Sequence, residues 1–190
     1  KNGFQDDADE NGLSQEAYYF LGGVLKHMKA ITCIANPTVN SYKRFVPGYE
    51  APTYITWSRK AKSPLERVPA RKGERTRLEL RSPDSSANPY LTLAVLLAAG
   101  LEGINDKIKP PKSVDEDVQR MPEEEIAERG IEALPKNLKE AVCEMEQDDL
   151  VKNVLGEKLS AKLIAAYRKA YKDYSTQVTD WELSNYLYRL

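Results

Sequence analysis

One helix signal constrains the fold of this 190-residue chain more than any other feature. Asn88 is a good N-cap, Pro89 suits the first helical position, and residues 91–100 are apolar on every helical face. A helix of this kind is expected to be buried, so the rest of the chain must cover it. With 41% hydrophobic residues the chain can bury one such core, but it is too short for two large domains.

Further helices are expected before and after this core helix. Residues 14 to about 30 carry apolar side chains at helical spacing behind an N-cap at Ser14. Residues 156 to about 173 repeat apolar positions every three or four residues, and shorter amphipathic helices are expected between 134 and 155. His27 lies within the first of these helices, where a structural role is expected.

Two short segments have the composition of strands. Residues 53–57 are β-branched and aromatic, and residues 76–82 alternate between apolar and charged side chains. The pattern predicts an α+β fold in which antiparallel strands pack with helices. The strands, the site loops and the core helix are expected in residues 1–108, and a helical carboxyl-terminal region of the same domain in residues 109–190.

Composition excludes several classes of function. The 28 basic and 29 acidic residues leave a net charge of −1, which argues against nucleic acid or a membrane surface as partner. The longest apolar run, residues 91–101, is too short to span a bilayer. Cys33 and Cys143 are far apart and form no C-x-x-C pair, which argues against zinc and is typical of a reducing compartment. The cytoplasm is the expected location.

The charged strand is the most informative pattern for chemistry. Alternation places Arg77, Glu79 and Arg81 on one face of residues 76–82, and a basic segment over residues 59–75 precedes it. Two interpretations are open on the pattern alone. The charges pair with one another on a solvated strand, or the arginines bind an anionic ligand while the carboxylate holds a divalent cation. The sequence contains no P-loop, so nucleotide binding here would need another device.

Two longer segments carry a family resemblance. Residues 36–52 read NPTVNSYKRFVPGYEAP, which resembles the NPTxNSYKRLVPGYEAP signature of glutamine synthetases. Residues 77–91, RLELRSPDSSANPYL, resemble the R-[IVL]-E-x-R-x-x-D-x-x-x-NPY segment of the same family. The likeness runs along the whole chain, which is similar to the C-terminal part of the catalytic domain of a type I (prokaryotic) glutamine synthetase. Only about half of such an enzyme is present, so the fragment is expected to be inactive alone.

The resemblance implies a reaction and its partners. In this family ATP phosphorylates the γ-carboxylate of glutamate, and ammonia then displaces phosphate to give glutamine, with Mg²⁺ or Mn²⁺ as the metal. By resemblance Arg44 lies beside the reacting carboxylate, Glu50 binds ammonium and takes its proton, and Arg81 binds the α-carboxylate of glutamate.

The remaining roles implied by the resemblance concern nucleotide and metal. Arg67 and Arg77 are expected to contact ATP phosphates, and Glu79 is expected to be a metal ligand. Lys62 stands where the family usually has an arginine that binds the transferring phosphate. Lysine keeps the positive charge of this catalytic position but cannot form the two parallel hydrogen bonds of a guanidinium group. This departure leaves open a γ-glutamyl-amine (polyamine) ligase, or a weakened homologue that acts as a binding or assembly module.

The end of the chain is apolar for a free terminus. Residues 181–188 read WELSNYLY, and the ring assemblies of the family, double-ring dodecamers, imply that this segment docks on another subunit. Packing on its own chain is the alternative.

Overall fold

The computed structural model describes residues 1–46, 51–70 and 73–187. Its long helices are α1 (Gln15–Ala35), α2 (Pro89–Asn105) and α6 (Glu157–Ser175). Its shorter helices are α3 (Glu123–Glu128), α4 (Leu138–Gln147), α5 (Asp149–Leu155) and α7 (Asp180–Tyr186), with 3-10 turns η1 (Val39–Arg44), η2 (Gly73–Arg75) and η3 (Val118–Arg120).

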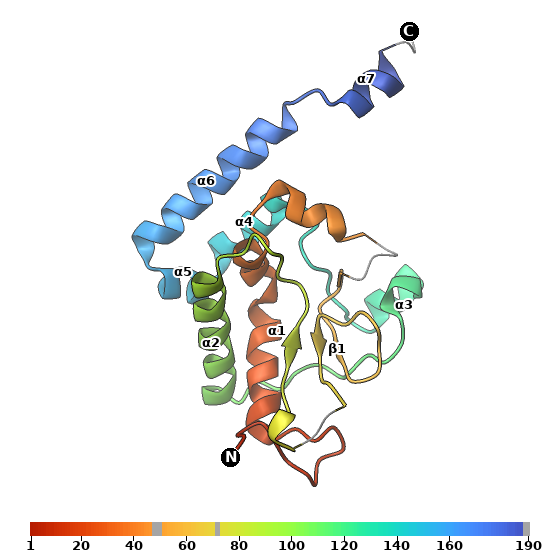
Figure 1. Cartoon of the computed structure of the whole chain (residues 1–190), viewed down its shortest axis with the longest axis vertical. Helices are drawn as coiled ribbons and strands as arrows, with labels where there is room; N and C mark the ends of the chain where they lie inside the picture. Colours follow the sequence, from red (N-terminus) through yellow and green to blue (C-terminus); the bar gives the residue numbers. More distant parts are fainter. Residues whose placement is uncertain (47–50, 71–72, 188–190) are drawn as a thin grey trace.

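Helix α1 is the centre of the core and begins where the sequence predicts. The Ser14 hydroxyl accepts a hydrogen bond from the backbone N–H of Ala17, which is an N-cap. The helix continues to Ala35, about one turn beyond the predicted end, because its apolar stripe is buried along most of its length. In Figure 1 α1 lies between α2 and the strands.

Two glycines let α1 and α2 pack unusually closely. A Cβ atom built on Gly23 would lie 2.1 Å from the carbonyl oxygen of Ala99 and 2.7 Å from the Cα of Gly103. A side chain at either glycine would therefore force the helices apart. Bringing the backbones together buries Val95 and Ala99 completely against α1.

The prediction that the core helix is buried on every face is wrong. Val95 and Ala99 are buried, but Leu93, Leu97 and Leu101 are each more than half exposed. These three leucines recur at four-residue spacing, so they form one exposed stripe along α2. The reason is physical: in the described chain α2 packs against α1 and α5, and neither helix covers this stripe.

A small sheet stands beside the helices, and the α+β fold class is confirmed. Its strands are β1 (Trp57–Ser58), β2 (Glu66–Arg67) and β3 (Glu79–Leu80), in that order. The sheet is mixed, because β1 pairs with β2 in parallel and β2 pairs with β3 in antiparallel register.

The strands are shorter than predicted. Most of the β-rich segment 53–57 lies outside the sheet and is tied by an isolated bridge between Tyr54 and Ala133. Proline and polar connections break the pairing after two residues, although Leu78 and Leu80 still pack against the core as the alternation predicts.

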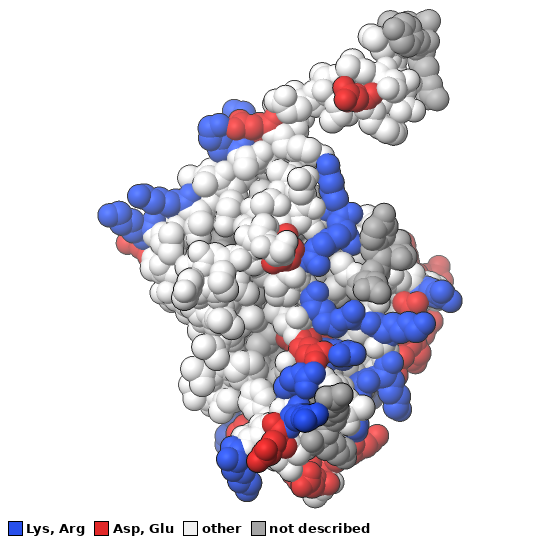
Figure 2. Space-filling view, viewed as in Figure 1, with Lys and Arg blue, Asp and Glu red and all other residues white. Residues whose placement is uncertain are grey.

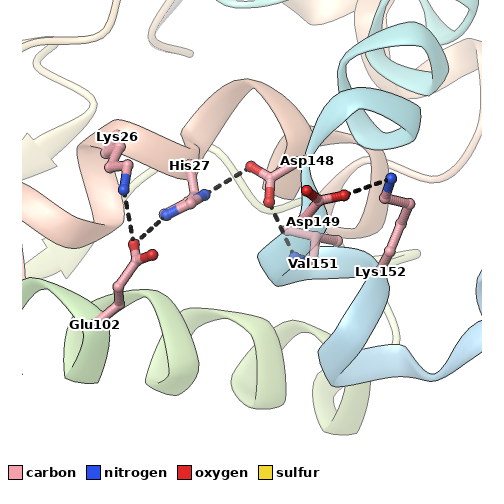
Figure 3. Close-up of polar contacts among 7 residues, drawn as sticks. All are labelled: Lys26, His27, Glu102, Asp148, Asp149, Val151 and Lys152. Atoms are coloured by element: carbon pink, nitrogen blue, oxygen red, sulfur yellow. Dashed lines mark hydrogen bonds and ion pairs between the residues drawn. The ribbon is translucent and has the colours of Figure 1, made fainter.

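A buried histidine joins three helices. His27 of α1 is 8% exposed, and its Nδ1 lies 2.7 Å from Oδ2 of Asp148, the residue between α4 and α5. Its Nε2 contacts the carboxylate of Glu102 on α2, which Lys26 also contacts (Figure 3). Burial by itself lowers the pKa of His27, but the hydrogen bonds to Asp148 and Glu102 outweigh it and raise the pKa. The cluster fits an imidazolium that donates from both nitrogens.

The carboxyl-terminal helices extend away from this core. Helix α6 packs on α4 and α5, with Leu163, Tyr167 and Tyr171 against the core, and α7 projects beyond it (Figure 1). In α7 Trp181 is 63% exposed and its ring contacts Tyr186 edge-on, at 5.6 Å between centroids. Among the described residues, therefore, the tail does not pack on the body of its own chain. No helix in the described part is long and apolar enough to cross a membrane.

Candidate active site

The charged strand presents the alternation that the sequence predicts. Glu79 on β3 lies opposite Arg67 on β2, and its Oε2 accepts from Arg67 Nε at 2.8 Å and Nη2 at 2.7 Å. Its Oε1 accepts from Arg77 Nε at 2.9 Å and contacts Nη2 of the same residue. The carboxylate is thus held between two guanidinium forks.

These ion pairs keep Glu79 ionised. Burial raises the pKa of Glu79, but the hydrogen bonds and charges of Arg67 and Arg77 outweigh it and hold the pKa below its usual value. Both arginines remain about half exposed, so they keep donors for an outside anion. This geometry is compatible with a solvated strand whose charges pair and with a binding site for an anionic ligand, because the charges pair with one another and also face solvent.

A second carboxyl group lies on the neighbouring strand, within reach of the charge of Glu79. Glu66 on β2 is 3% exposed, and its Oε2 has no hydrogen-bond partner among the described residues. Burial, with a smaller contribution from the charge of Glu79, raises the pKa of Glu66 to about 8. This raised pKa favours the neutral form of Glu66, which a buried position accommodates better than a charged carboxylate.

Arg44 is held at the meeting point of three segments. It ends η1, and its Nη2 donates to Asn36 Oδ1 at 2.5 Å and to the backbone carbonyl of Ser82. The guanidinium also lies over the ring of Phe45, 4.9 Å from the ring centroid. Burial lowers the pKa of Arg44, and the charge of Asp84 partly opposes this.

The other predicted site residues are placed less completely. Arg81 follows β3, and its Nη1 donates to the carbonyl of Lys62, while the Lys62 side chain is exposed. These contacts bring Arg81 and the Lys62 backbone together on the connection before β2. Glu50 lies outside the described residues.

Among the predicted site residues, Glu79 is the candidate metal ligand. Among the described residues, no group of three or more His, Cys, Asp or Glu side chains is arranged to hold a metal ion. Glu79 offers hard oxygen ligands, which suit a divalent cation such as Mg²⁺ or Mn²⁺, but both oxygens contact arginines here. One carboxylate fits the role of a single ligand and cannot form the site alone.

Lysine and arginine side chains gather over the strands. Figure 2 shows them as a band down one side of the visible face, beside a broad area without charges over the helices. The fold and this band define a helix-rich α+β domain with a cationic strand face suited to anionic ligands.

Comparison with known proteins identifies the family. The model of the glutamine synthetase catalytic domain matches residues 1–186, and the chain belongs to this family. Glutamine synthetase of Thermotoga maritima is 53% identical over 99% of the chain, and that of Clostridium saccharobutylicum is 51% identical over 98%. The chain spans 43% and 42% of those two proteins, that is, less than half of each.

Solved structures agree with the sequence relatives. A structure described as "GmaS/ADP complex-Conformation 1" superposes with a TM-score of 0.84 at 39% identity, covering 98% of this chain and 43% of its own. "Apo GmaS without ligand" gives 0.79 at 38% identity, covering 98% and 41%. The fold expected from the resemblance is therefore confirmed.

Proposed function

We propose that the chain is the part of a glutamate–ammonia ligase that binds glutamate and the phosphates of ATP. The observation that carries the proposal is the cationic strand face, in a chain that contains the signature segment 36–52 and is about half identical to glutamine synthetases. One of the structural relatives is an ADP complex, which supports nucleotide binding. The two free thiols support a cytoplasmic location.

The proposed chemistry has two steps. An oxygen of the glutamate γ-carboxylate attacks the γ-phosphorus of ATP, and ADP leaves. Ammonia then attacks the acyl carbon of γ-glutamyl phosphate, loses a proton, and inorganic phosphate leaves with the oxygen that had joined it to carbon. A bound Mg²⁺ or Mn²⁺ supplies positive charge for the phosphate oxygens.

The described residues take separate roles in this proposal. Arg44 stabilises negative charge on the reacting carboxyl group, and Arg81 binds the α-carboxylate. Arg67 and Arg77 contact ATP phosphates, and Glu79 is one metal ligand. Glu50, outside the described residues, takes the proton from ammonium.

The test is synthesis by the complete protein. With ATP, magnesium, glutamate and ammonia it is expected to release glutamine and ADP in equal amounts, whereas the 190-residue chain alone makes none. The same assay with a polyamine in place of ammonia examines the alternative γ-glutamyl-amine ligase. Faster turnover with the polyamine, or no ligation with either amine, would contradict the proposal.

Lys62 yields a prediction on rate. Replacing it by Arg in the complete protein is expected to restore a bidentate phosphate contact and to speed acyl-phosphate formation about tenfold, or about 1.4 kcal/mol. Rapid-quench measurement of ADP formation checks this. Lys60→Arg, two residues away and paired with Asp115, is the matched control and should change little. A slower Lys62→Arg enzyme would mean that the site depends on lysine.

We also propose that α7 docks on another subunit of a homo-oligomer, a double ring of twelve. The exposed Trp181, Tyr186 and Leu187 support this, because a free helix rarely keeps such apolar area in water. Deleting residues 181–190 from the complete protein is expected to reduce the assembly size without lowering the cooperativity of unfolding. Light scattering and thermal melting separate the two effects, and an unchanged oligomer would contradict the docking.

A further inference from the structure

The charge of Arg44 has no carboxylate partner among the described residues. Arg67 and Arg77 form ion pairs with Glu79, but the contacts of Arg44 are the amide oxygen of Asn36 and the carbonyl of Ser82. Both acceptors are neutral. A half-buried guanidinium held in this way keeps its full positive charge for another group.

Asn36 is built into the fold as a fixed support. It is completely buried, and its backbone N–H donates to the Thr32 carbonyl at 2.9 Å as the C-cap of α1. Within the part of the chain that the structure describes, its side-chain Nδ2 is buried without a hydrogen-bond partner, as are Nε of Arg44 and Oγ of Ser82. A buried polar group without a hydrogen-bond partner costs free energy. That three such groups belong to Arg44 and the two residues that hold it therefore needs an explanation.

The charge of the Asp84 carboxylate acts on Arg44, yet the two side chains form no ion pair within the described chain. Burial raises the pKa of Asp84, but hydrogen bonds from Ser41 and Ser86 outweigh it and hold the pKa low. The Ser86 hydroxyl donates to Asp84 at 2.6 Å, and the Asp84 backbone N–H donates to the Ala35 carbonyl at 3.1 Å. These contacts occupy Asp84 with other partners, while its charge still acts on Arg44.

We infer that Asn36 is a positioning residue that holds Arg44 through a neutral oxygen, so that the guanidinium charge stays available to an anionic carboxylate or phosphate group of the substrate. This inference rests on the proposed function. An aspartate in the same position would hold the arginine equally well and neutralise it. The side-chain amide of Asn36 therefore matters in two ways: its shape lets it hold Arg44, and its neutrality leaves the charge of Arg44 uncompensated.

Asn36→Asp in the complete protein tests this, because it keeps size and acceptor while adding one negative charge. The KM for glutamate is expected to rise about tenfold and kcat to fall, with the KM for ATP unchanged. If Asn36 were only structural, Asn36→Asp would lower the melting temperature, but the folded enzyme would keep the wild-type KM for glutamate. Asn40→Asp, an exposed change in the same signature segment, is the matched control and should keep wild-type constants.

A second variant guards against a folding failure. Asp84→Asn removes one negative charge that acts on Arg44 and should lower the KM for glutamate, the opposite sign from Asn36→Asp. A raised KM in Asp84→Asn, or an unchanged KM in a folded Asn36→Asp, would overturn the inference.

Anion binding separates this inference from the proposed function. Glutamate and inorganic phosphate should raise the melting temperature of the wild-type complete protein, and Asn36→Asp should lose that shift. A wild type that shows the shift but makes no glutamine would contradict the proposed function alone. Equal shifts in wild type and Asn36→Asp, or none in wild type, would contradict the positioning role.

Discussion

Replacing His27 by Gln is expected to lower the free energy of unfolding by about 3 kcal/mol at pH 6, because two largely buried carboxylates then lose their shared cation. The side chains of His27 and Asp148 are 9% and 14% exposed, so solvent screens this pair weakly. Glu102 keeps only its contact with Lys26 (Figure 3). Urea unfolding of wild type and variant measures the difference.

The pH dependence follows from the direction of each pKa shift. The pKa of His27 is raised, so its contribution is complete below the unfolded value of about 6.5 and is lost as pH rises through the folded value. Burial raises the pKa of Asp148 and of Glu102, but their polar contacts, those with His27 first, outweigh it and leave both pKa values lowered. The stability that these two carboxylates contribute is therefore lost as pH falls through their pKa values in the folded protein. The difference between wild type and variant should therefore be largest near pH 6 and shrink toward pH 9.

Lys26 provides the control on the same helix. Its side chain is 49% exposed, and Lys26→Gln should cost about 0.5 kcal/mol or less, as exposed ion pairs usually do. A cost of His27→Gln that matches this control, or that is the same at pH 6 and pH 9, would show that the histidine is not a buried cation.

Replacing Glu50 by Gln in the complete protein is expected to reduce glutamine synthesis about a hundredfold, in line with the loss of a general base. The variant keeps the size of the side chain and leaves Arg44, Arg77 and Glu79 unchanged. Phosphoryl transfer should then suffer much less than amide formation, and water should consume part of the acyl phosphate. ADP released without glutamine is expected to rise as a fraction of turnover.

Separate assays of ADP and glutamine check this prediction. Glu74→Gln, an exposed acid in the connection before β3, is the matched control for loss of one carboxylate. Equal losses of both products in Glu50→Gln, or no loss of either, would contradict a role in taking the proton from ammonium.

The sequence predicts elements well where a local signal defines them. Ser14 and Asn88 begin their helices as expected, because each side chain accepts from the backbone N–H groups of the next turn. The alternation around Glu79 was also informative, since it reflects which side chains can reach one another across neighbouring strands.

Other features depend on distant parts of the chain and were not predictable. The leucine stripe of α2, Leu93, Leu97 and Leu101, has the composition of a buried face. Its exposure depends on which other elements of the protein cover it. Pairing of His27 with Asp148 joins residues 121 positions apart. The buried Glu66 resembles a surface residue in sequence, and its pKa is raised by burial and by the charge of Glu79, neither of which the sequence shows.

The support of Arg44 shows the same limit within a recognised segment. Asn36 and Asp84 both lie in the two segments that carry the family resemblance, yet their wide separation along the chain gives no indication that they flank one guanidinium. The structure brings the end of α1 against the segment after β3, where the Asp84 N–H meets the Ala35 carbonyl. This contact places both residues around Arg44.

The most direct test of the account follows one oxygen atom through the reaction. Glutamate labelled with ¹⁸O in its γ-carboxylate is given to the complete protein with ATP, magnesium and ammonia, and the inorganic phosphate is analysed by mass spectrometry. A γ-glutamyl phosphate intermediate predicts one ¹⁸O transferred to phosphate for each glutamine formed. Phosphate that carries no label, while glutamine is made, would contradict the mechanism proposed for this chain.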